Sequence, residues 1–379
     1  MTVTEEVRPA GVERPGAVED AVAVATPGQL MRWKFMRHRV AVLCLGILVI
    51  FYSCVLFAEF VAPYAPTHHD TDYMYMPPQP IRFVENGRFQ ARPFVYGMVG
   101  KLDPKTFKTT YTLDQTQKYP IHLLVKGDPY KMWGLIPGDV HLIGVEKGTL
   151  FLFGTDKQGR DVLSRIIQGG RISLSVGLLG IAISFIIGIT IGGISGYFGG
   201  TVDLIIQRVI EFIRSVPTLP LWMAFSVALP RTWSVVQIYF GIVVILSLVG
   251  WTGLARVVRG KFMSLREEEY VMAAQLNGAS EARIIFRHML PSFASHIIAS
   301  LTLSVPGMIL GETSLSFIGL GLQEPAISWG VLLKDAQRIM VLANSPWLLI
   351  PGVFVIIAIL CFNFVGDGLR DAADPYAHV

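Results

Sequence analysis

Long uncharged apolar stretches alternate with polar segments along this chain, and their lengths predict helices that span a membrane. A helix needs about 20 consecutive apolar residues to cross a bilayer. Six stretches approach or exceed this length: residues 40–58, 172–195, 215–229, 232–255, 293–320 and 346–365. We therefore expect an all-α polytopic membrane protein with six transmembrane helices.

The segment before the first stretch lacks helical periodicity of apolar residues, and residues 1–31 are expected to form a disordered cytosolic tail. A basic cluster leads into the first span: Arg32, Lys34, Arg37, His38 and Arg39. A cleaved signal peptide is the alternative, but the lead-in is long and no small-x-small cleavage site precedes Pro63. Residues 32–62 are therefore predicted to hold a retained transmembrane helix.

Polar and turn-forming residues dominate residues 63–153, which we expect to form a large external insertion after the first helix, folded as a small cap. Two of its pieces, residues 121–125 and 150–153, are β-prone. Residues 154–375 are predicted to hold the other five spans, and residues 376–379 to be a short C-terminal tail.

Lysine and arginine near the ends of the spans predict the orientation, because short cytoplasmic loops carry an excess of them. The segment between the fourth and fifth spans contains Arg256, Arg259, Lys261, Arg266, Arg283 and Arg287. The short loops on the other side contain only Arg231, Lys334 and Arg338. Both termini and the segment 256–291 are therefore expected in the cytosol.

Glycine and proline positions support a bundle of packed helices. Gly188, Gly192 and Gly196 are four residues apart and share one helix face, where another backbone can approach closely. The prolines at positions 217, 220 and 306 are expected to kink their helices. Such features suit a moving pore, but static membrane proteins also have them.

Composition narrows the class of protein further. The chain is 52% hydrophobic and 16% charged, with a mean hydropathy of +0.51, whereas an average soluble domain is about 25% charged. The net charge of +4 is too small to indicate nucleic-acid binding. The three cysteines, Cys44, Cys54 and Cys361, all lie in apolar runs and are expected to be buried thiols, without the partner residues that a metal or redox site needs.

The basic segment between the fourth and fifth spans contains two predicted short helices. The first begins with Glu267, Glu268 and Glu269, which complement the positive end of the helix dipole, and it ends at Gly278. Ser280 is expected to cap the second helix, which should stop before Pro291. The joint is small enough to enter a groove of a partner protein, although an ordinary cytosolic loop is the alternative.

At these residues the chain resembles a known family. Ala273-Ala274-x-x-x-Gly278, followed by His-Met-Leu-Pro at 288–291, is similar to the "EAA" coupling motif of binding-protein-dependent ABC importer permeases. Further matches to the dipeptide/oligopeptide/nickel permease family, of the second-permease type, are GTDKQGRDVLSR at 154–165, GYFGGTVD at 196–203, LSFIGLG at 315–321, SWG at 328–330 and NFVGDGLRDAADP at 363–375. The resemblance covers residues 32–66 and 150–375.

The resemblance implies the ABC importer permease fold in a bacterial cytoplasmic (inner) membrane. It implies three kinds of partner besides the lipid bilayer: a second homologous permease subunit, two cytosolic ATPase subunits and an external solute-binding protein. ATP and Mg would be bound by the ATPases, because nothing here matches Gly-x-x-x-x-Gly-Lys-Ser/Thr. We expect no catalytic, cofactor-binding or metal-binding residues on this chain. The implied ATPase-coupling residues are Met272, Ala273, Ala274, Gly278, Ala279, Ser280, His288, Leu290 and Pro291.

Two features depart from the family's pattern. Met272 occupies the position of the motif's glutamate, so another residue must anchor the elbow if that carboxylate does so elsewhere. The insertion of about 80 residues between Pro66 and Gly154 is longer than in typical peptide permeases. The cargo therefore stays open: short peptides are expected, and oligosaccharides, opines or nickel are the alternatives.

Glu312, the acid within the fifth span, is a candidate for the translocation path, because ionisable groups inside a membrane are usually functional. The alternative, which we favour, is a carboxyl group that packs between helices. At the outer end, Gly159, Arg160, Asp161 and Arg165 are expected to fix the turn into the second span. An ion-coupled secondary transporter and a membrane-embedded hydrolase are remote alternatives, because the chain shows neither inverted halves nor a paired nucleophile and base.

Overall fold

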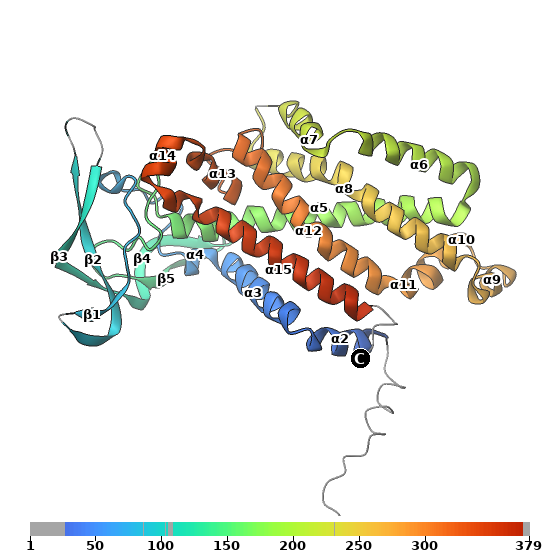
Figure 1. The fold of residues 1–379 in the computed structure, drawn as a ribbon, viewed down its shortest axis with the longest axis horizontal. Coiled ribbons are helices and arrows are strands. Elements are labelled where there is room, and N and C mark those ends of the chain that lie inside the picture. Colours follow the sequence, from blue (N-terminus) through green and yellow to red (C-terminus); the bar gives the residue numbers. More distant parts are fainter. Residues whose placement is uncertain (1–26, 86, 103, 105–108, 231, 374–379) are drawn as a thin grey trace, which may run out of the picture.

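The computed structural model describes residues 27–373, except 86, 103, 105–108 and 231. A long bundle of helices carries two β-sheets at one end and a pair of short helices, α9 and α10, at the other (Figure 1). The helices are α2 (Pro27–Arg37), α3 (Arg39–Leu56), α4 (Ala58–Val61), η1 (Thr71–Tyr73), α5 (Val162–Phe198), α6 (Gly200–Ser215), α7 (Thr218–Val227), α8 (Val235–Leu265), α9 (Glu269–Leu276), α10 (Glu281–Arg283), π-helix η2 (Ile284–Met289), α11 (Leu290–Ser292), α12 (Ala294–Ile318), α13 (Trp329–Lys334), η3 (Asp335–Gln337), α14 (Ile339–Asn344), η4 (Pro346–Leu349) and α15 (Ile350–Ala373).

Among the described residues, five helical segments are long and apolar enough to cross a membrane, and they correspond to five of the six predicted spans. They are α3, α5, α8, α12 and Pro346–Ala373, which joins η4 and α15. The third predicted span, residues 215–229, corresponds to the ten-residue apolar helix α7, which follows α6 after a break. The break falls at Val216, whose extended backbone is the conformation that a following proline imposes, here Pro217. By contrast, Pro306 lies inside α12 without ending it.

The predicted N-terminal tail differs in part from the structure. Residues 1–26 lie outside the described residues, but residues 27–31 belong to α2. Met31 and Phe35 of this helix both pack against the main core, and Phe35 lies close to Gly368 of α15, a tertiary contact that apolar periodicity within residues 1–31 could not reveal.

The insertion contains two antiparallel sheets. Strands β1 (Arg82–Glu85), β2 (Arg88–Leu102) and β3 (Thr109–Pro120) form one sheet in that order. Strands β4 (His122–Met132) and β5 (Ile136–Gly144) form a hairpin. The β-prone piece 121–125 falls in β4, but residues 150–153 are not a strand. Their Phe151 is instead buried in a loop, against Tyr64 at 5.4 Å between ring centroids.

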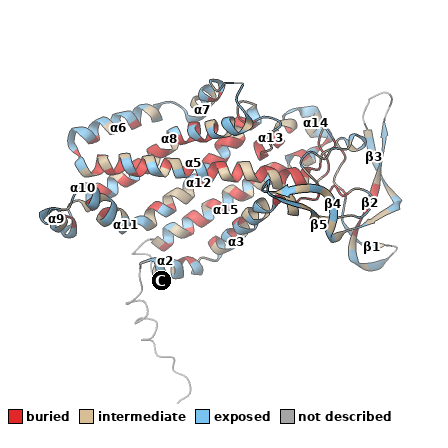
Figure 2. Cartoon of the chain, turned by 180° about the vertical axis from the view of Figure 1, so that it is seen from behind, coloured by how far each residue is buried: buried red, intermediate tan, exposed pale blue. Residues whose placement is uncertain are grey.

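The core lies along the middle of the bundle, where buried residues follow the facing sides of α5, α8 and α12 (Figure 2). Outward-facing side chains of the long helices are apolar and exposed, for example Leu43, Ile186 and Ile356, as a lipid-facing surface requires. The close approach predicted for the glycine face is confirmed. A Cβ atom on Gly192 would lie 2.5 Å from the carbonyl oxygen of Ala255 in α8.

Replacing Gly192 with alanine should therefore force α5 and α8 apart. Overpacking of this kind costs about 1–3 kcal/mol of unfolding free energy. Gly307→Ala in α12 is the matched control, because nothing lies within 4 Å of a Cβ atom there. Thermal unfolding of the two purified variants in detergent checks this, and equal melting temperatures would show that the α5–α8 contact tolerates the methyl group.

Candidate coupling elbow and outer ion-pair network

The predicted elbow lies between α8 and α12, at the end of the bundle opposite the sheets (Figure 1). Gly278 ends α9 with φ +72°, a backbone conformation that glycine adopts without steric cost. Two backbone hydrogen bonds close the turn. The N–H of Gly278 donates to the carbonyl oxygen of Gln275 at 2.9 Å, and the N–H of Ala279 donates to the carbonyl oxygen of Ala274 at 3.1 Å. The predicted helix end at Gly278 is confirmed.

Three details of the elbow differ from expectation. Only Glu269 lies in the first turn of α9, because Glu268 is its N-cap. Ser280 occupies the N-cap position of α10, but its side chain makes no capping hydrogen bond. The chain also continues through Pro291 as the first turn of α11, where a missing N–H costs nothing. The π-helical turn η2 precedes it and widens the backbone ahead of the proline.

A second hydrophobic cluster fixes the elbow to the ends of the long helices. Its buried members come from α5, α8, α9, η2, α12 and the residue before α12: Ile189, Leu254, Val258, Phe262, Val271, Ile284, Met289, Phe293 and Ile297. Val271 of α9 is 0% exposed. The rings of Phe262 and Phe293 meet edge to face, with centroids 5.6 Å apart. Displacing α9 would therefore displace the ends of α8 and α12 with it.

The opposite side of α9 is an exposed apolar tip, formed by Met272, Ala273 and Leu276. Leu276 is 89% exposed and Met272, at the motif's glutamate position, is 44% exposed. Of the other predicted coupling residues, Gly278, Ser280 and Pro291 are exposed. Four are half-buried: Ala274, Ala279, His288 and Leu290. The exposed carboxylates of residues 267–269 border the tip.

Beside the elbow, Asp203 of α6 joins α5 and α8. The Arg259 guanidinium donates to the Asp203 carboxylate, with an Nη2–Oδ2 distance of 2.5 Å, and the Ser195 hydroxyl donates to the same carboxylate. This clamp holds the turn between α5 and α6 against α8. The sequence motif at 196–203 contains Asp203, but its partner Arg259 lies 56 residues away, and the sequence identifies Arg259 only as part of a basic segment.

At the sheet end, a network of charges joins the turn before α5 to the loop after α12. The Arg160 guanidinium donates to Glu324 at 2.6 Å and to Asp156 at 2.7 Å, and Lys157 donates to Asp335 at 2.9 Å. Arg165 also pairs with Asp156. Burial alone would raise the pKa of Glu324, but the hydrogen bond from Arg160 and the nearby positive charges outweigh it and lower that pKa to about 2.

The predicted role of Asp161 in the same turn is confirmed. Its carboxylate is the N-cap of α5 and accepts the backbone N–H of Ser164 at 2.7 Å and the Ser164 hydroxyl at 2.6 Å. Glu324 was missed at the sequence level, because it lies 164 residues from Arg160 in a short loop with no recognisable motif for an ion pair.

Glu312 lies in the centre of the helix packing, where its side chain is 0% exposed. The hydroxyl groups of Ser173 and Ser316 donate to its carboxyl oxygens at 3.1 Å and 2.8 Å. Ser173 also accepts the backbone N–H of Trp329 at 3.0 Å. These contacts from α5, α12 and α13 favour the interpretation of Glu312 as a packing group over that of a pathway group.

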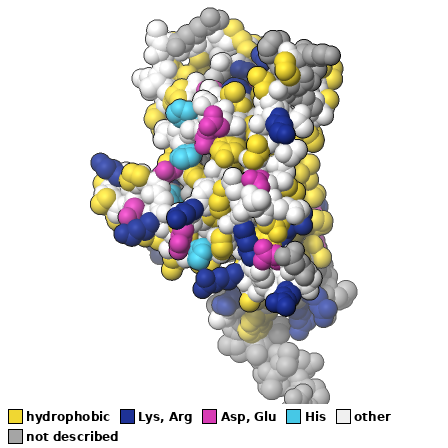
Figure 3. All heavy atoms as spheres, turned by 90° about the vertical axis from the view of Figure 1, so that its left-hand side faces the viewer, with side chains coloured by type: hydrophobic (Ala, Val, Ile, Leu, Met, Phe, Trp, Pro, Cys, Tyr) yellow, Lys and Arg dark blue, Asp and Glu magenta, His cyan; other side chains and the backbone are white. Residues whose placement is uncertain are grey.

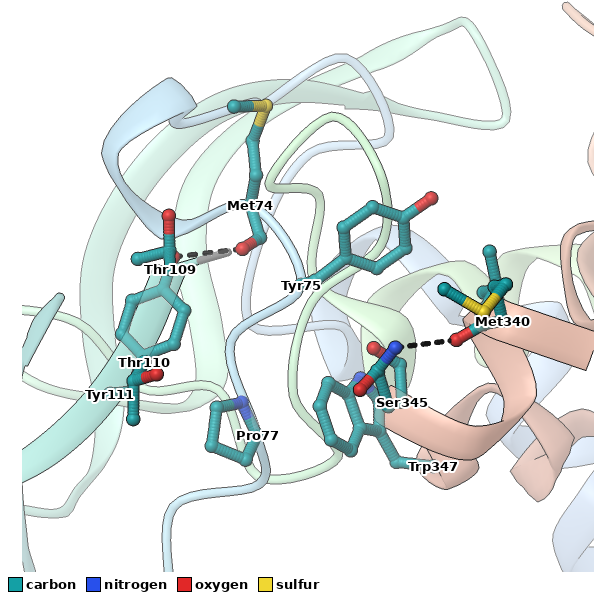
Figure 4. A pocket seen from close by; sticks show the side chains of 11 residues that line it. Met74, Tyr75, Pro77, Thr109, Thr110, Tyr111, Met340, Ser345 and Trp347 are labelled. Atoms are coloured by element: carbon teal, nitrogen blue, oxygen red, sulfur yellow. Dashed lines mark hydrogen bonds between the residues drawn. The ribbon is translucent and has the colours of Figure 1, made fainter. Parts of the chain in front are cut away.

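A cleft of about 780 Å³ opens between the insertion and the sheet end of the bundle (Figure 4). Its walls come from the loop before β1, the start of β3, and the segment from α14 to η4. They include Met74, Tyr75, Pro77, Tyr111, Met340 and Trp347. The Tyr111 hydroxyl donates to the Met74 carbonyl at 2.8 Å, and the Trp347 indole donates to the Thr155 carbonyl at 3.0 Å. The insertion is joined to the same segment through Thr155, whose hydroxyl oxygen accepts the backbone N–H of Met76 at 2.8 Å.

Comparison with known proteins gives matches over the helical part of the chain. The sequence model of the family described as "Binding-protein-dependent transport system inner membrane component" matches residues 188–378, half of the chain. The model described as "N-terminal TM domain of oligopeptide transport permease C" matches residues 26–78. The first match includes the whole elbow and Glu312.

Two curated relatives align over 224 residues, 59% of this chain. The oligopeptide transport system permease protein OppC of Haemophilus influenzae is 46% identical, and the alignment covers 70% of it. The dipeptide transport system permease protein DppC of Bacillus subtilis is 41% identical, and the alignment covers 68% of it. A solved structure of the MetNI methionine ABC transporter in an inward-facing conformation superposes with a TM-score of 0.43 and 17% identity, over 55% of this chain and 96% of that one.

The ion-pair network at the sheet end should make the free energy of unfolding depend on pH through Glu324. A carboxyl group whose pKa is lowered on folding stabilises the fold above its ordinary pKa of 4.5, and this contribution disappears as the pH falls toward 2. Glu324→Gln should therefore lower the melting temperature near neutral pH, and the difference from the parent protein should shrink on acidification below about pH 4.5. A melting-temperature difference that is constant with pH would contradict the ionic role of Glu324.

Proposed function

This chain belongs to the family of binding-protein-dependent transport system inner membrane components, and we propose that it carries short peptides across the bacterial cytoplasmic membrane. It is a multi-pass permease subunit of an ABC importer. Peptide cargo is supported by the two relatives named for oligopeptide and dipeptide transport, at 46% and 41% identity. In this proposal a second permease completes the pore, and the energy comes from ATP and Mg bound by two separate ATPase subunits.

The observation that carries the proposal is the two-sided construction of α9. Leu276 and Met272 form an exposed apolar tip, while Val271 on the same helix is fully enclosed. An exposed apolar patch bordered by polar residues is typical of a protein interface. We place that interface against the ATPase subunits on the cytosolic side, which agrees with the basic residues of the surrounding segment.

Coupling then follows from packing. When ATP binding brings the ATPase subunits together, the α9 tip moves with the groove that holds it. Val271 and the Phe262–Phe293 pair pass this displacement to the ends of α8 and α12, which are two walls of the bundle. Because close-packed interiors are stiff, a rigid shift of the elbow becomes a change in helix angle rather than a local deformation.

Docking here differs from the family's pattern at the position of Met272. An apolar side chain, 44% exposed, occupies the place where the motif has a carboxylate. We propose that this elbow is held in the ATPase groove mainly by Met272 and Leu276, with Glu267, Glu268 and Glu269 at the rim of the contact. Affinity would then come from buried apolar area rather than from a buried ion pair.

At the other end we propose that an external solute-binding protein docks and releases cargo. The outer face mixes acidic, basic and apolar side chains without a large patch of one charge (Figure 3). The cleft between Tyr75, Tyr111 and Trp347 lies on this side, next to the network of Arg160 and Glu324. A surface of this kind suits a transient protein contact, because its polar groups stay solvated when the partner leaves.

Replacing Leu276 with glutamate should disconnect the ATPase subunits. The change places a charge in the centre of the proposed contact, where losing an anchor costs about 2 kcal/mol or more, and copurification of the ATPases and peptide uptake should each fall at least about tenfold. The matched control is Ser264→Glu, which adds the same charge at an exposed position of α8 outside the tip.

The measurement is ATPase copurification together with peptide uptake in proteoliposomes. If the Leu276 variant retains its ATPases and imports at the parental rate, the α9 tip is not the docking site. Loss of both properties in the Ser264 variant as well would show only that added negative charge is tolerated nowhere in this region.

A further inference from the structure

The turn of the β4–β5 hairpin carries large apolar side chains where turns usually carry small polar ones. Residues 132–138 contain no charge and lie between Lys131 and Asp139. Trp133, Leu135 and Ile136 are 47%, 80% and 54% exposed. The N–H of Leu135 donates to the Met132 carbonyl at 3.0 Å, which closes a tight turn at the tip. Exposing three large apolar side chains to water is unfavourable in free energy.

This tip lies at the end of a membrane-spanning helix. The indole N–H of Trp133 donates to the carbonyl oxygen of Leu56, the last residue of α3, at 2.7 Å. Its ring lies 5.8 Å from that of Phe57. In Figures 1 and 2 the hairpin reaches from the sheets back toward this end of the bundle. The tip is therefore beside the bundle rather than at the far end of the insertion.

Two features mark Leu56 as the level where lipid meets water. Only 17% of the spanning window of α3 is buried within this chain, so most of its apolar surface faces outward up to Leu56. At the same level Arg171 donates to the Val55 carbonyl at 3.0 Å and pairs with Glu59. Tryptophan side chains are enriched at this boundary, with the ring in the interface and the N–H hydrogen-bonded.

The backbone of the turn aims Trp133 at the helix. Trp133 has φ +52° and Gly134 has φ +75°, the pair of left-handed conformations found in a tight hairpin turn. Asparagine or aspartate is the common residue at the first of these positions, and tryptophan is rare there. The indole hydrogen bond and the contact with Phe57 offset this conformational cost.

We propose that the hairpin tip, residues 132–136, inserts into the lipid leaflet at the outer end of α3 and anchors the insertion to the membrane surface. Trp133 lies at the headgroup level, and Leu135 and Ile136 contact the acyl chains. The occupant is lipid because the tip is uncharged and continues the exposed apolar surface of Leu56 and Phe57. The anchor would set the height and tilt of the outer cleft, whichever cargo is carried.

The photo-crosslinking probe p-benzoylphenylalanine tests this in the complete transporter, reconstituted in phosphatidylcholine and phosphatidylglycerol vesicles with alkyne-tagged acyl chains. One variant carries the probe in place of Leu135. The control carries it in place of Asp139, an exposed residue about 10 Å farther along β5 and away from the tip. Lipid adducts on this chain are quantified after irradiation.

We expect at least about fivefold more lipid adduct with the probe at position 135 than at position 139, because only the tip reaches the acyl chains. Equal and low lipid labelling at the two positions would place the tip in water and overturn the proposal. Crosslinks from position 135 to another protein subunit, without lipid adducts, would overturn it as well, because a partner protein would then cover the tip.

Discussion

The proposed coupling of the elbow to the helix bundle depends on the packing of Val271 and its neighbours under α9. Val271, Ile284 and Met289 of the elbow are enclosed by residues of α5, α8 and α12, and the Phe262–Phe293 ring pair joins the last two of these helices. An elbow that touched only its own turn could bind a partner but could not move the bundle. Here the enclosed side and the exposed side of α9 are one residue apart, so the proposed binding and transmission would share one short helix.

Contacts at both ends hold α5 in place, so the proposed movement of the elbow would occur relative to this helix. At the sheet end, Asp161 caps the helix, and the network of Arg160 and Glu324 holds the preceding turn. Toward the other end, Gly192 lets α5 lie directly against the backbone of α8. The insertion contacts the same end of the bundle at two places. Trp133 of the β4–β5 turn is hydrogen-bonded to Leu56 of α3, and the insertion forms one side of the cleft. The long helices thus connect the proposed docking region at the sheet end with the proposed coupling elbow at the other end.

Features that depend on local sequence were predictable, and those that depend on distant partners were not. Apolar length located five spans, spacing revealed the glycine face, and Gly278 gave the end of α9 because a left-handed residue there favours glycine. The kink expected at Pro217 is a full break, so the third span is the ten-residue helix α7 and is shorter than its apolar length predicted. The pairs Asp203–Arg259 and Arg160–Glu324, and the contact of Trp133 with Leu56, join residues 56, 164 and 77 positions apart, which no local pattern specifies.

The most direct test of rigid transmission is Val271→Ser in the full transporter, with ATP hydrolysis and peptide uptake measured together in proteoliposomes. Val257→Ser, at an exposed position of α8, serves as the control. The account predicts that the ATPases still bind and hydrolyse ATP while uptake per ATP falls at least about tenfold, because a polar group in the cluster loosens the elbow. Unchanged uptake per ATP in the Val271 variant would contradict it.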